Sequence, residues 1–255
     1  MIIFRQWVPF FAALAFLAGC GGDGGSGDGD ASTDVDTDAD VDTDSDTDSD
    51  TDVDTDADGG SDGGSDTDEC TYSMAVVADI DETLTTSDLE WVYQIAVPTY
   101  DAEMRPEADV LMQGYAALGY EVFYITARGE GLSLLDGTSA REATGQWLID
   151  HGFPFEDDNL FLSEGFGTWG NSAASYKTGI LEGLEALGWR FIYAYGNADT
   201  DIEAFLNIAI PAEDVFLVGD LAGTLGVSPV TNEDAYAQHI LDQMPSVPEA
   251  TCAEE

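Results

Sequence analysis

The stretch MAVVADIDETLTTSD, residues Met74 to Asp88, ends an apolar run on one aspartate and places a second two residues later. Residues 74–78 predict a buried strand. Burying a carboxylate is costly unless a cation, a metal or hydrogen-bond donors compensate. Two carboxylates directly after a buried strand therefore indicate a functional site at Asp79 and Asp81. The simpler alternative is a capped turn.

Apolar runs and helical patterns alternate through the rest of the chain. Continuous hydrophobicity within the runs favours a parallel sheet covered on both faces. The alternation predicts an open α/β, Rossmann-like fold with about five strands and no large cap domain. Residues 90–101 and 163–172 lack periodicity, and we expect a small flap and a loop over the site there. The predicted strands are 74–78, 121–125, 159–162, 190–195 and 215–218, and the predicted helices are 107–118, 139–150, 175–187 and 200–208.

Polar side chains follow several of these strands. Thr126 and Arg128 follow the second strand, Asn197 and Asp201 follow the fourth, and Lys177 opens a helix. In open α/β folds ligands bind at the carboxyl ends of the strands. We therefore expect these groups to converge with Asp79 and Asp81. Asp199 is expected to be the N-cap of the helix that follows it.

This set of residues suits phosphoryl transfer. Asp79 is the candidate nucleophile, because a carboxylate can accept a phosphoryl group as an aspartyl phosphate. Asp81 is the candidate general acid and base. Mg²⁺ prefers oxygen ligands, and the expected ones are Asp79, the backbone carbonyl of Asp81 and Asn197. Lys177 is expected to hold the phosphate and position the nucleophile.

Further residues are expected to support the site or to line it. Thr126 is expected to hold phosphate oxygens. Arg128 either binds the phosphate or a substrate head group, or pairs with surface acids. Asp201 is expected to position Lys177 or a metal-bound water. Tyr93, Tyr100, Phe166 and Trp169 either line an apolar substrate pocket or pack without a role in binding.

The motifs DIDETLT, YITAR, Lys177 and GNADTD resemble, in order, the four motifs of the haloacid dehalogenase (HAD) superfamily of phosphatases. Within it, RPEADVLMQGYAALGYEVFYITARG and YAYGNADTDIEAFLNIAIPAEDVFLV are similar to the lipin-type, or LNS2, domain. Phosphatidate phosphatases and certain phosphatidylinositol-transfer proteins share that domain. The resemblance implies Mg²⁺-dependent removal of phosphate from phosphatidate or a related phospholipid.

Two features bear on the alternatives. Lipins usually have glycine at the position of Glu82, and DIDET also resembles secreted bacterial acid phosphatases that act on soluble phosphomonoesters. The lipid-binding transfer-protein version lacks the nucleophile, whereas this chain has both Asp79 and Asp81, which favours catalysis over binding alone. A broad-specificity acid phosphatase and a non-catalytic phosphatidate-binding module remain the alternatives to a phosphatidate phosphatase.

The amino terminus reads as a targeting segment. One cation, Arg5, precedes an apolar run from Trp7 to Ala18, which is shorter than the roughly 20 residues of a membrane span. Its end, LAGC at residues 17–20, resembles a bacterial lipobox. We expect residues 1–19 to be a signal peptide and Cys20 to be acylated. Acylation would anchor the protein in the bacterial cell envelope, at the outer membrane, facing the periplasm or the surface. The alternative is an ordinary signal peptide with a chance cysteine.

Residues 20–69 are rich in Asp, Thr, Ser and Gly, and we expect an extended, disordered tether. The whole chain carries a net charge of −46. Beyond the tether, residues 70–255 still hold 32 acids against five cations, which excludes a general nucleic-acid binder. Loose counterion binding is expected on the tether, because it lacks the glycine and glutamate pattern of a calcium-binding EF-hand loop.

Cys70 and Cys252 bracket the predicted phosphatase domain, residues 70–255. Outside the cytoplasm such a pair commonly forms a disulfide. We expect a Cys70–Cys252 bond, and two free thiols are the alternative. No protein partner can be inferred from the sequence.

Overall fold

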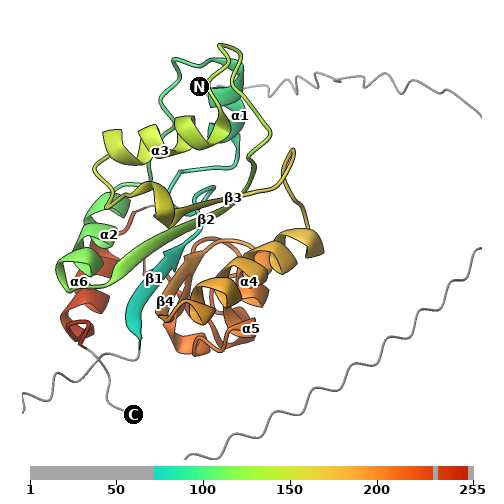
Figure 1. The fold of residues 1–255 in the computed structure, drawn as a ribbon. Helices are drawn as coiled ribbons and strands as arrows, with labels where there is room; N and C mark the ends of the chain where they lie inside the picture. Colours follow the sequence, from blue (N-terminus) through green and yellow to red (C-terminus); the bar gives the residue numbers. More distant parts are fainter. Residues whose placement is uncertain (1–71, 232–234, 252–255) are drawn as a thin grey trace, which may run out of the picture. The chain divides into compact units, whose positions relative to one another are not determined.

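A computed structural model of the chain describes residues 72–231 and 235–251 (Figure 1). The chain divides into two units between Asp62 and Gly63, and every described residue belongs to the second. The predicted signal peptide and acidic tether lie outside the described residues, as do the acylation site Cys20 and the pair Cys70 and Cys252. Within the described part of the chain, no helix is both long and apolar enough to span a bilayer.

Six parallel strands form one sheet in the order β3-β2-β1-β4-β5-β6. This order places β1 at the centre, between β2 and β4, so its carboxyl end meets the ends of both neighbours. The predicted parallel α/β sheet is confirmed, with one more strand than expected. The strands are β1 (Ser73–Ala78), β2 (Glu121–Gly129), β3 (Leu160–Ser163), β4 (Trp189–Gly196), β5 (Val215–Leu217) and β6 (Ser228–Pro229).

Helices cover both faces of the sheet (Figure 1). Val76 and Ala78 of β1 belong to the core that includes α2, α3 and α6, whereas Ala75 and Val77 face the core built with α4 and α5. Side chains that alternate between two buried cores explain why this strand is apolar at every position. The helices are α1 (Leu89–Ala96), α2 (Ala108–Ala117), α3 (Ala140–Asp150), α4 (Asn171–Ala186), α5 (Asp199–Asn207) and α6 (Ala237–Gln243).

The helices α1 and α6 and the strand β6 were not predicted, and α4 begins four residues before the expected start. In α1 the buried residues are Glu90, Trp91 and Gln94, while Leu89 and Val92 are exposed. Two polar side chains of this helix thus face inward and two apolar side chains face solvent, which is the reverse of the usual amphipathic pattern. A search for an apolar stripe along one helix face therefore misses α1. The strand β6 has only two residues and ends on a proline, which is typical of a sheet edge.

A small flap lies beside the carboxyl end of β1. It is closed at its base by an antiparallel bridge between Thr85 and Met104, and it contains α1. Among the described residues this flap is the main departure from strand and helix alternation near the site, in agreement with the predicted absence of a large cap. The loop between β3 and α4 extends on the other side of the same edge (Figure 1).

Candidate active site

A buried chain of three charged groups lies at the carboxyl end of β1. The Lys177 ammonium, from α4, donates to Asp79 Oδ1 at 2.6 Å and to Asp201 Oδ1 at 2.5 Å. All three side chains are buried. Helix α4 starts at Asn171, so Lys177 lies in its second turn rather than at its first residue. The single cation therefore bridges two carboxylates that come from separate elements.

Asp201 also holds the start of α5. Its Oδ2 accepts from the backbone N–H groups of Asn197 and Ala198, at 3.0 Å each. Gly196 precedes this turn, and a Cβ there would lie 2.6 Å from the Asp201 side chain, so only glycine fits. The prediction that Asp199 caps this helix is wrong. Asp199 is the first helical residue, and Asp201 satisfies the free backbone donors instead.

The ionisation of this chain reflects burial and mutual attraction. Burial raises the pKa of Asp79 to about 7, although Lys177 opposes the shift. Burial alone would lower the pKa of Lys177, but the Asp201 and Asp79 carboxylates raise it above its ordinary value. Lys177 is therefore a fixed positive charge. An additional cation beside Asp79 would favour its ionised form.

The oxygen atoms expected to bind a metal converge on one hydroxyl. Thr83 Oγ1 lies 3.3 Å from Asp79 Oδ2 and 3.1 Å from Asn197 Oδ1. One hydroxyl hydrogen serves only one of these oxygens at a time, so lone pairs remain available for a cation. Glu82 Oε2 accepts from Asn197 Nδ2 at 3.1 Å, which leaves the amide oxygen facing the Thr83 hydroxyl.

This all-oxygen donor set fits Mg²⁺, which keeps several waters and takes few carboxylates. In residues 72–231 and 235–251, no cluster of three or more His, Cys, Asp or Glu side chains is arranged to hold a metal. Any metal at Asp79 and Asn197 would therefore need backbone carbonyl, water and substrate oxygens to complete its coordination.

The loop after β1 is held by side chains from distant segments. Glu82 adopts a left-handed backbone with φ of 58°, a conformation that favours glycine. The buried Arg105 donates to the carbonyls of Glu82 at 2.7 Å and Thr83 at 3.1 Å. The Tyr236 hydroxyl also donates to the Thr83 carbonyl, at 3.1 Å. These contacts fix the turn that carries Asp79 and Asp81.

Asp81 has its own cation. The Arg128 guanidinium contacts both Asp81 carboxylate oxygens at 2.8–3.1 Å. The Thr126 hydroxyl donates to Asp81 Oδ2 at 3.0 Å. Arg128 is in turn held by the Thr144 hydroxyl and lies over the Trp91 ring. In this structure Thr126 and Arg128, both expected to bind substrate, contact the candidate general acid.

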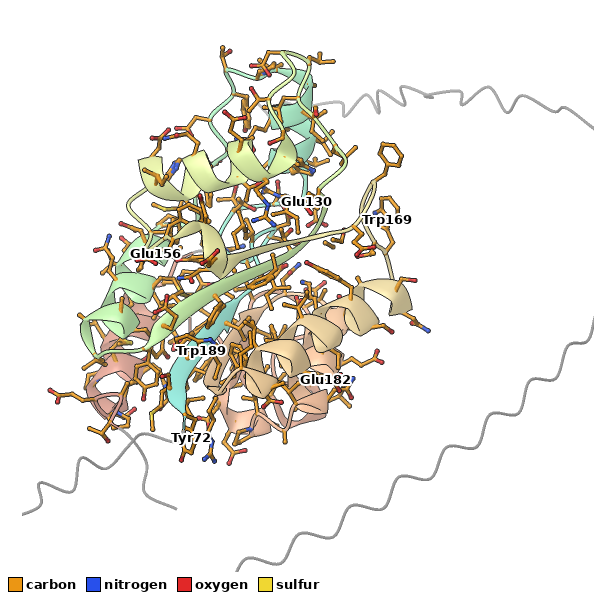
Figure 2. All side chains as sticks on the ribbon, viewed as in Figure 1. Tyr72, Glu130, Glu156, Trp169, Glu182 and Trp189 are labelled. Atoms are coloured by element: carbon orange, nitrogen blue, oxygen red, sulfur yellow. The ribbon has the colours of Figure 1, made fainter. Side chains whose placement is uncertain are left out.

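A pocket of about 510 Å³ opens above this pair. Asp81, Arg128 and Trp91 line it, together with Val92, Phe166 and Trp169, which we call the apolar rim. The rim side chains are 53, 74 and 76% exposed, respectively. Figure 2 shows Trp169 on the loop that extends between β3 and α4.

Two of the four candidate pocket aromatics lie elsewhere. Tyr93 and Tyr100 pack edge to face, with ring centroids 5.5 Å apart, and the Tyr100 hydroxyl donates to Glu90 at 2.7 Å. Neither lines the pocket of Asp81. Of the two alternatives left open by the sequence, packing without a role in that pocket holds for these two residues, which stabilise the flap.

Sequence reasoning missed several residues that support the site. Trp91 lies in a segment without periodicity, Thr144 lies inside a predicted helix, and Tyr236 lies far from every motif. The one available signal was the scarcity of cations. Only five occur from Cys70 onward, so a buried role for Arg105 could have been suspected.

The fold brings the four HAD-like motifs of the sequence together at one edge of a parallel α/β sheet. The family model described as "PITM 1-3, LNS2 domain" matches residues 76–219, and the chain belongs to this family.

Similarity to individual proteins is more distant. The chain is 26% identical over 169 residues to Protein retinal degeneration B of Drosophila melanogaster, which is 66% of this chain and 12% of that protein. It thus spans about an eighth of that relative's length. A crystal structure of Class C acid phosphatase from Bacillus anthracis with tungstate bound matches 51% of this chain and 54% of its own. Its TM-score is 0.37 and its sequence identity is 16%.

Proposed function

We propose that this domain is a Mg²⁺-dependent phosphomonoester hydrolase that acts through an aspartyl phosphate on Asp79. The observation that carries the proposal is the setting of Asp79. One of its oxygens is bound by the Lys177 ammonium, and the other shares the Thr83 hydroxyl with Asn197. The Lys177 ammonium offsets the negative charge of Asp79, and Mg²⁺ held by the neighbouring oxygens would offset more of it. The carboxylate could then approach a phosphoryl group without prohibitive repulsion.

The proposed reaction has two steps. In the first, an Asp79 oxygen attacks phosphorus, the bond from phosphorus to the alcohol oxygen breaks, and Asp81 gives its proton to that oxygen. In the second, Asp81 takes a proton from water, whose oxygen attacks phosphorus and releases phosphate and free Asp79. Mg²⁺ held by Asp79, Asn197 and the Asp81 carbonyl would offset the charge on the phosphate.

Phosphatidate or a related phospholipid is the favoured substrate. The pocket has a charged floor at Asp81 and Arg128 and an apolar rim, so it is suited to an amphipathic ester. The LNS2 family and the lipin-like motifs support the same choice. A second candidate is binding of phosphatidate without turnover, because the same pocket would hold such a ligand. The presence of both Asp79 and Asp81 favours catalysis.

The proposed location follows from the amino-terminal sequence. Acylation at Cys20 would place the domain on a membrane of the bacterial envelope, where phospholipid is at hand. The Cys70–Cys252 disulfide is part of the same proposal, because it requires an oxidising compartment.

Phosphate release by the purified chain, with Mg²⁺ and with EDTA, tests the function and its substrate. The panel holds phosphatidate in mixed micelles, lysophosphatidate, p-nitrophenyl phosphate and a nucleotide monophosphate. Mg²⁺-dependent turnover mainly of the lipids is expected. Turnover mainly of the soluble esters would instead identify a broad-specificity phosphatase. Binding of phosphatidate vesicles without any turnover would identify a lipid-binding module.

A further inference from the structure

We propose that Arg128 is a positioning residue that holds Asp81 for proton transfer and does not bind the substrate phosphate. This inference rests on the proposed phosphatase function. Arg128 Nε lies 3.1 and 3.0 Å from the two Asp81 oxygens, and its Nη2 lies 2.8 Å from Oδ1. The Thr126 hydroxyl adds a contact of 3.0 Å to Oδ2. Both oxygens of the carboxylate are thus oriented by fixed donors.

Arg128 itself has little freedom to turn toward another anion. It is 4% exposed. Its Nη1 donates to the Thr144 hydroxyl at 3.0 Å, and its Cζ lies 4.4 Å from the centre of the Trp91 ring. A move toward a phosphate at Asp79 would break these contacts and leave a buried guanidinium with fewer partners, which is costly.

The two carboxylates therefore have separate cations. Lys177 contacts Asp79 and Asp201, and Arg128 contacts Asp81. When Asp81 gives its proton to the leaving alcohol it becomes a carboxylate, and a two-pronged guanidinium contact stabilises that product and fixes its direction. A lysine would supply the charge without the planar geometry. The two-pronged contact of the Arg128 guanidinium with Asp81 should therefore contribute most to turnover of substrates whose leaving group needs a proton.

The leaving group of the substrate makes this testable. An alkyl phosphate such as lysophosphatidate needs a proton on its departing oxygen, whereas p-nitrophenolate leaves readily without one. The value of kcat/KM reports the steps up to departure of the alcohol, so it isolates this proton transfer. In the full chain, we expect Arg128→Met to lower kcat/KM about 100-fold for lysophosphatidate, in line with general acid catalysis, and about tenfold or less for p-nitrophenyl phosphate.

Three further variants set the controls. Arg128→Lys should fall between wild type and Arg128→Met, since it keeps the charge and loses the two-pronged contact. Arg141→Met removes another arginine–carboxylate pair, 2.7 Å from Glu130, outside the site, and both esters should be turned over as in wild type. If Arg128→Met does not fold, Thr144→Val removes one support of Arg128 without touching Asp81. It should then give the same preferential loss in weaker form.

A double-mutant cycle with Asp81→Asn separates the two possible roles of Arg128. A residue that acts only through Asp81 should cost little more once Asp81 is replaced, whereas an independent phosphate contact should cost the same in both backgrounds. Additive losses, equal losses for both esters, or a loss confined to KM would overturn the inference while leaving the phosphatase intact. A wild-type chain that turns over neither ester would overturn the proposed function and this inference with it.

Discussion

The buried charge cluster of Asp79, Lys177 and Asp201 and the apolar rim of the pocket are built in opposite ways. The three side chains of the charge cluster are buried, and each of its charges has an opposite charge within 2.6 Å. The apolar rim of Val92, Phe166 and Trp169 is more than half exposed, and its residues lie on α1 and on a loop. The charged side chains of the cluster are held in place by attraction to one another. The exposed side chains of the rim are available to contact a substrate.

This difference separates what each region controls. A change in the charge cluster leaves a buried charge without its partner, so it affects both the chemistry and the free energy of unfolding. A change in the rim removes apolar side-chain surface that is already exposed to solvent in the free protein. The rim should therefore affect which substrate is preferred and leave stability nearly unchanged.

The largest effect is expected from Asp79→Asn, which removes the nucleophile and keeps the size of the side chain. Turnover should fall by at least about 10⁴-fold for every substrate. Asp199→Asn is the matched control, because Asp199 is an exposed carboxylate beside Asp81 in the pocket lining, and it accepts from the neighbouring Thr200 backbone. Phosphate release would be measured for both variants. A variant Asp79→Asn with most of its activity would remove Asp79 from the reaction.

Lys177→Met should give the largest loss of stability. It leaves Asp79 and Asp201 buried without their shared cation, which should lower the free energy of unfolding by about 3–5 kcal/mol. Arg141→Met is the control, because its pair with Glu130 is 40 and 49% exposed. That variant should lose less than about 1 kcal/mol. Urea denaturation measures both, and equal losses would contradict the contrast between the two ion pairs.

A smaller effect is expected at His239, which is linked through Tyr195 to the backbone of Asp79. Its Nε2 lies 3.0 Å from the hydroxyl of Tyr195, whose carbonyl accepts from the Asp79 backbone. Burial lowers the pKa of His239 to about 4, and Asp242 on the same helix opposes this only in part.

The sign of the resulting pH dependence follows from proton binding. The unfolded chain protonates His239 near pH 6.5 and the folded chain only near 4, so stability falls as pH drops through this window. The loss between pH 7 and pH 5 should be about 2 kcal/mol. His239→Gln should lack this component in urea denaturation at the two pH values. An unchanged pH dependence in the variant would show that other groups cause it.

The smallest effect is expected at the rim. Replacing Phe166 and Trp169 together by serine should raise KM for phosphatidate in mixed micelles roughly 3- to 10-fold, which corresponds to about 1 kcal/mol of lost apolar contact. The KM for p-nitrophenyl phosphate should change much less. Leu187→Ser is the control, because Leu187 is 77% exposed and lies outside the pocket. Equal changes for both substrates would deny the rim a part in substrate choice.

The sequence was most informative for elements whose place follows from a single physical rule, such as the continuous hydrophobicity of a buried strand. The five predicted strands lie within a few residues of the observed ones, because strands buried on both faces read as continuous apolar runs. Asp79 and Asp201 each follow a strand, and ligand binding at the carboxyl ends of parallel strands was enough to expect both at one edge. Lys177 was expected there from its place near the start of a helix and among the HAD-like motifs.

Pairing within the site could not be read from the sequence. Whether Arg128 faces the phosphate, a surface acid or Asp81 depends on the direction of a long side chain and on its contact with Trp91. Trp91 belongs to α1, whose buried face also carries polar residues. Likewise, Asp201 rather than Asp199 satisfies the backbone donors of α5, because the turn at Gly196 brings the Asp201 side chain close. Such choices are made by tertiary packing and not by local propensity.

Trapping the phosphoenzyme tests the central claim most directly. The full chain would be mixed with Mg²⁺ and phosphate-labelled p-nitrophenyl phosphate, whose leaving group departs without a proton from Asp81, and then quenched in acid. Asp81→Asn would be included to slow hydrolysis of the intermediate. We predict protein-bound label that hydroxylamine releases, as expected of an acyl phosphate, and none in Asp79→Asn. Turnover without trapped label in Asp81→Asn, or label that persists in Asp79→Asn, would contradict the account.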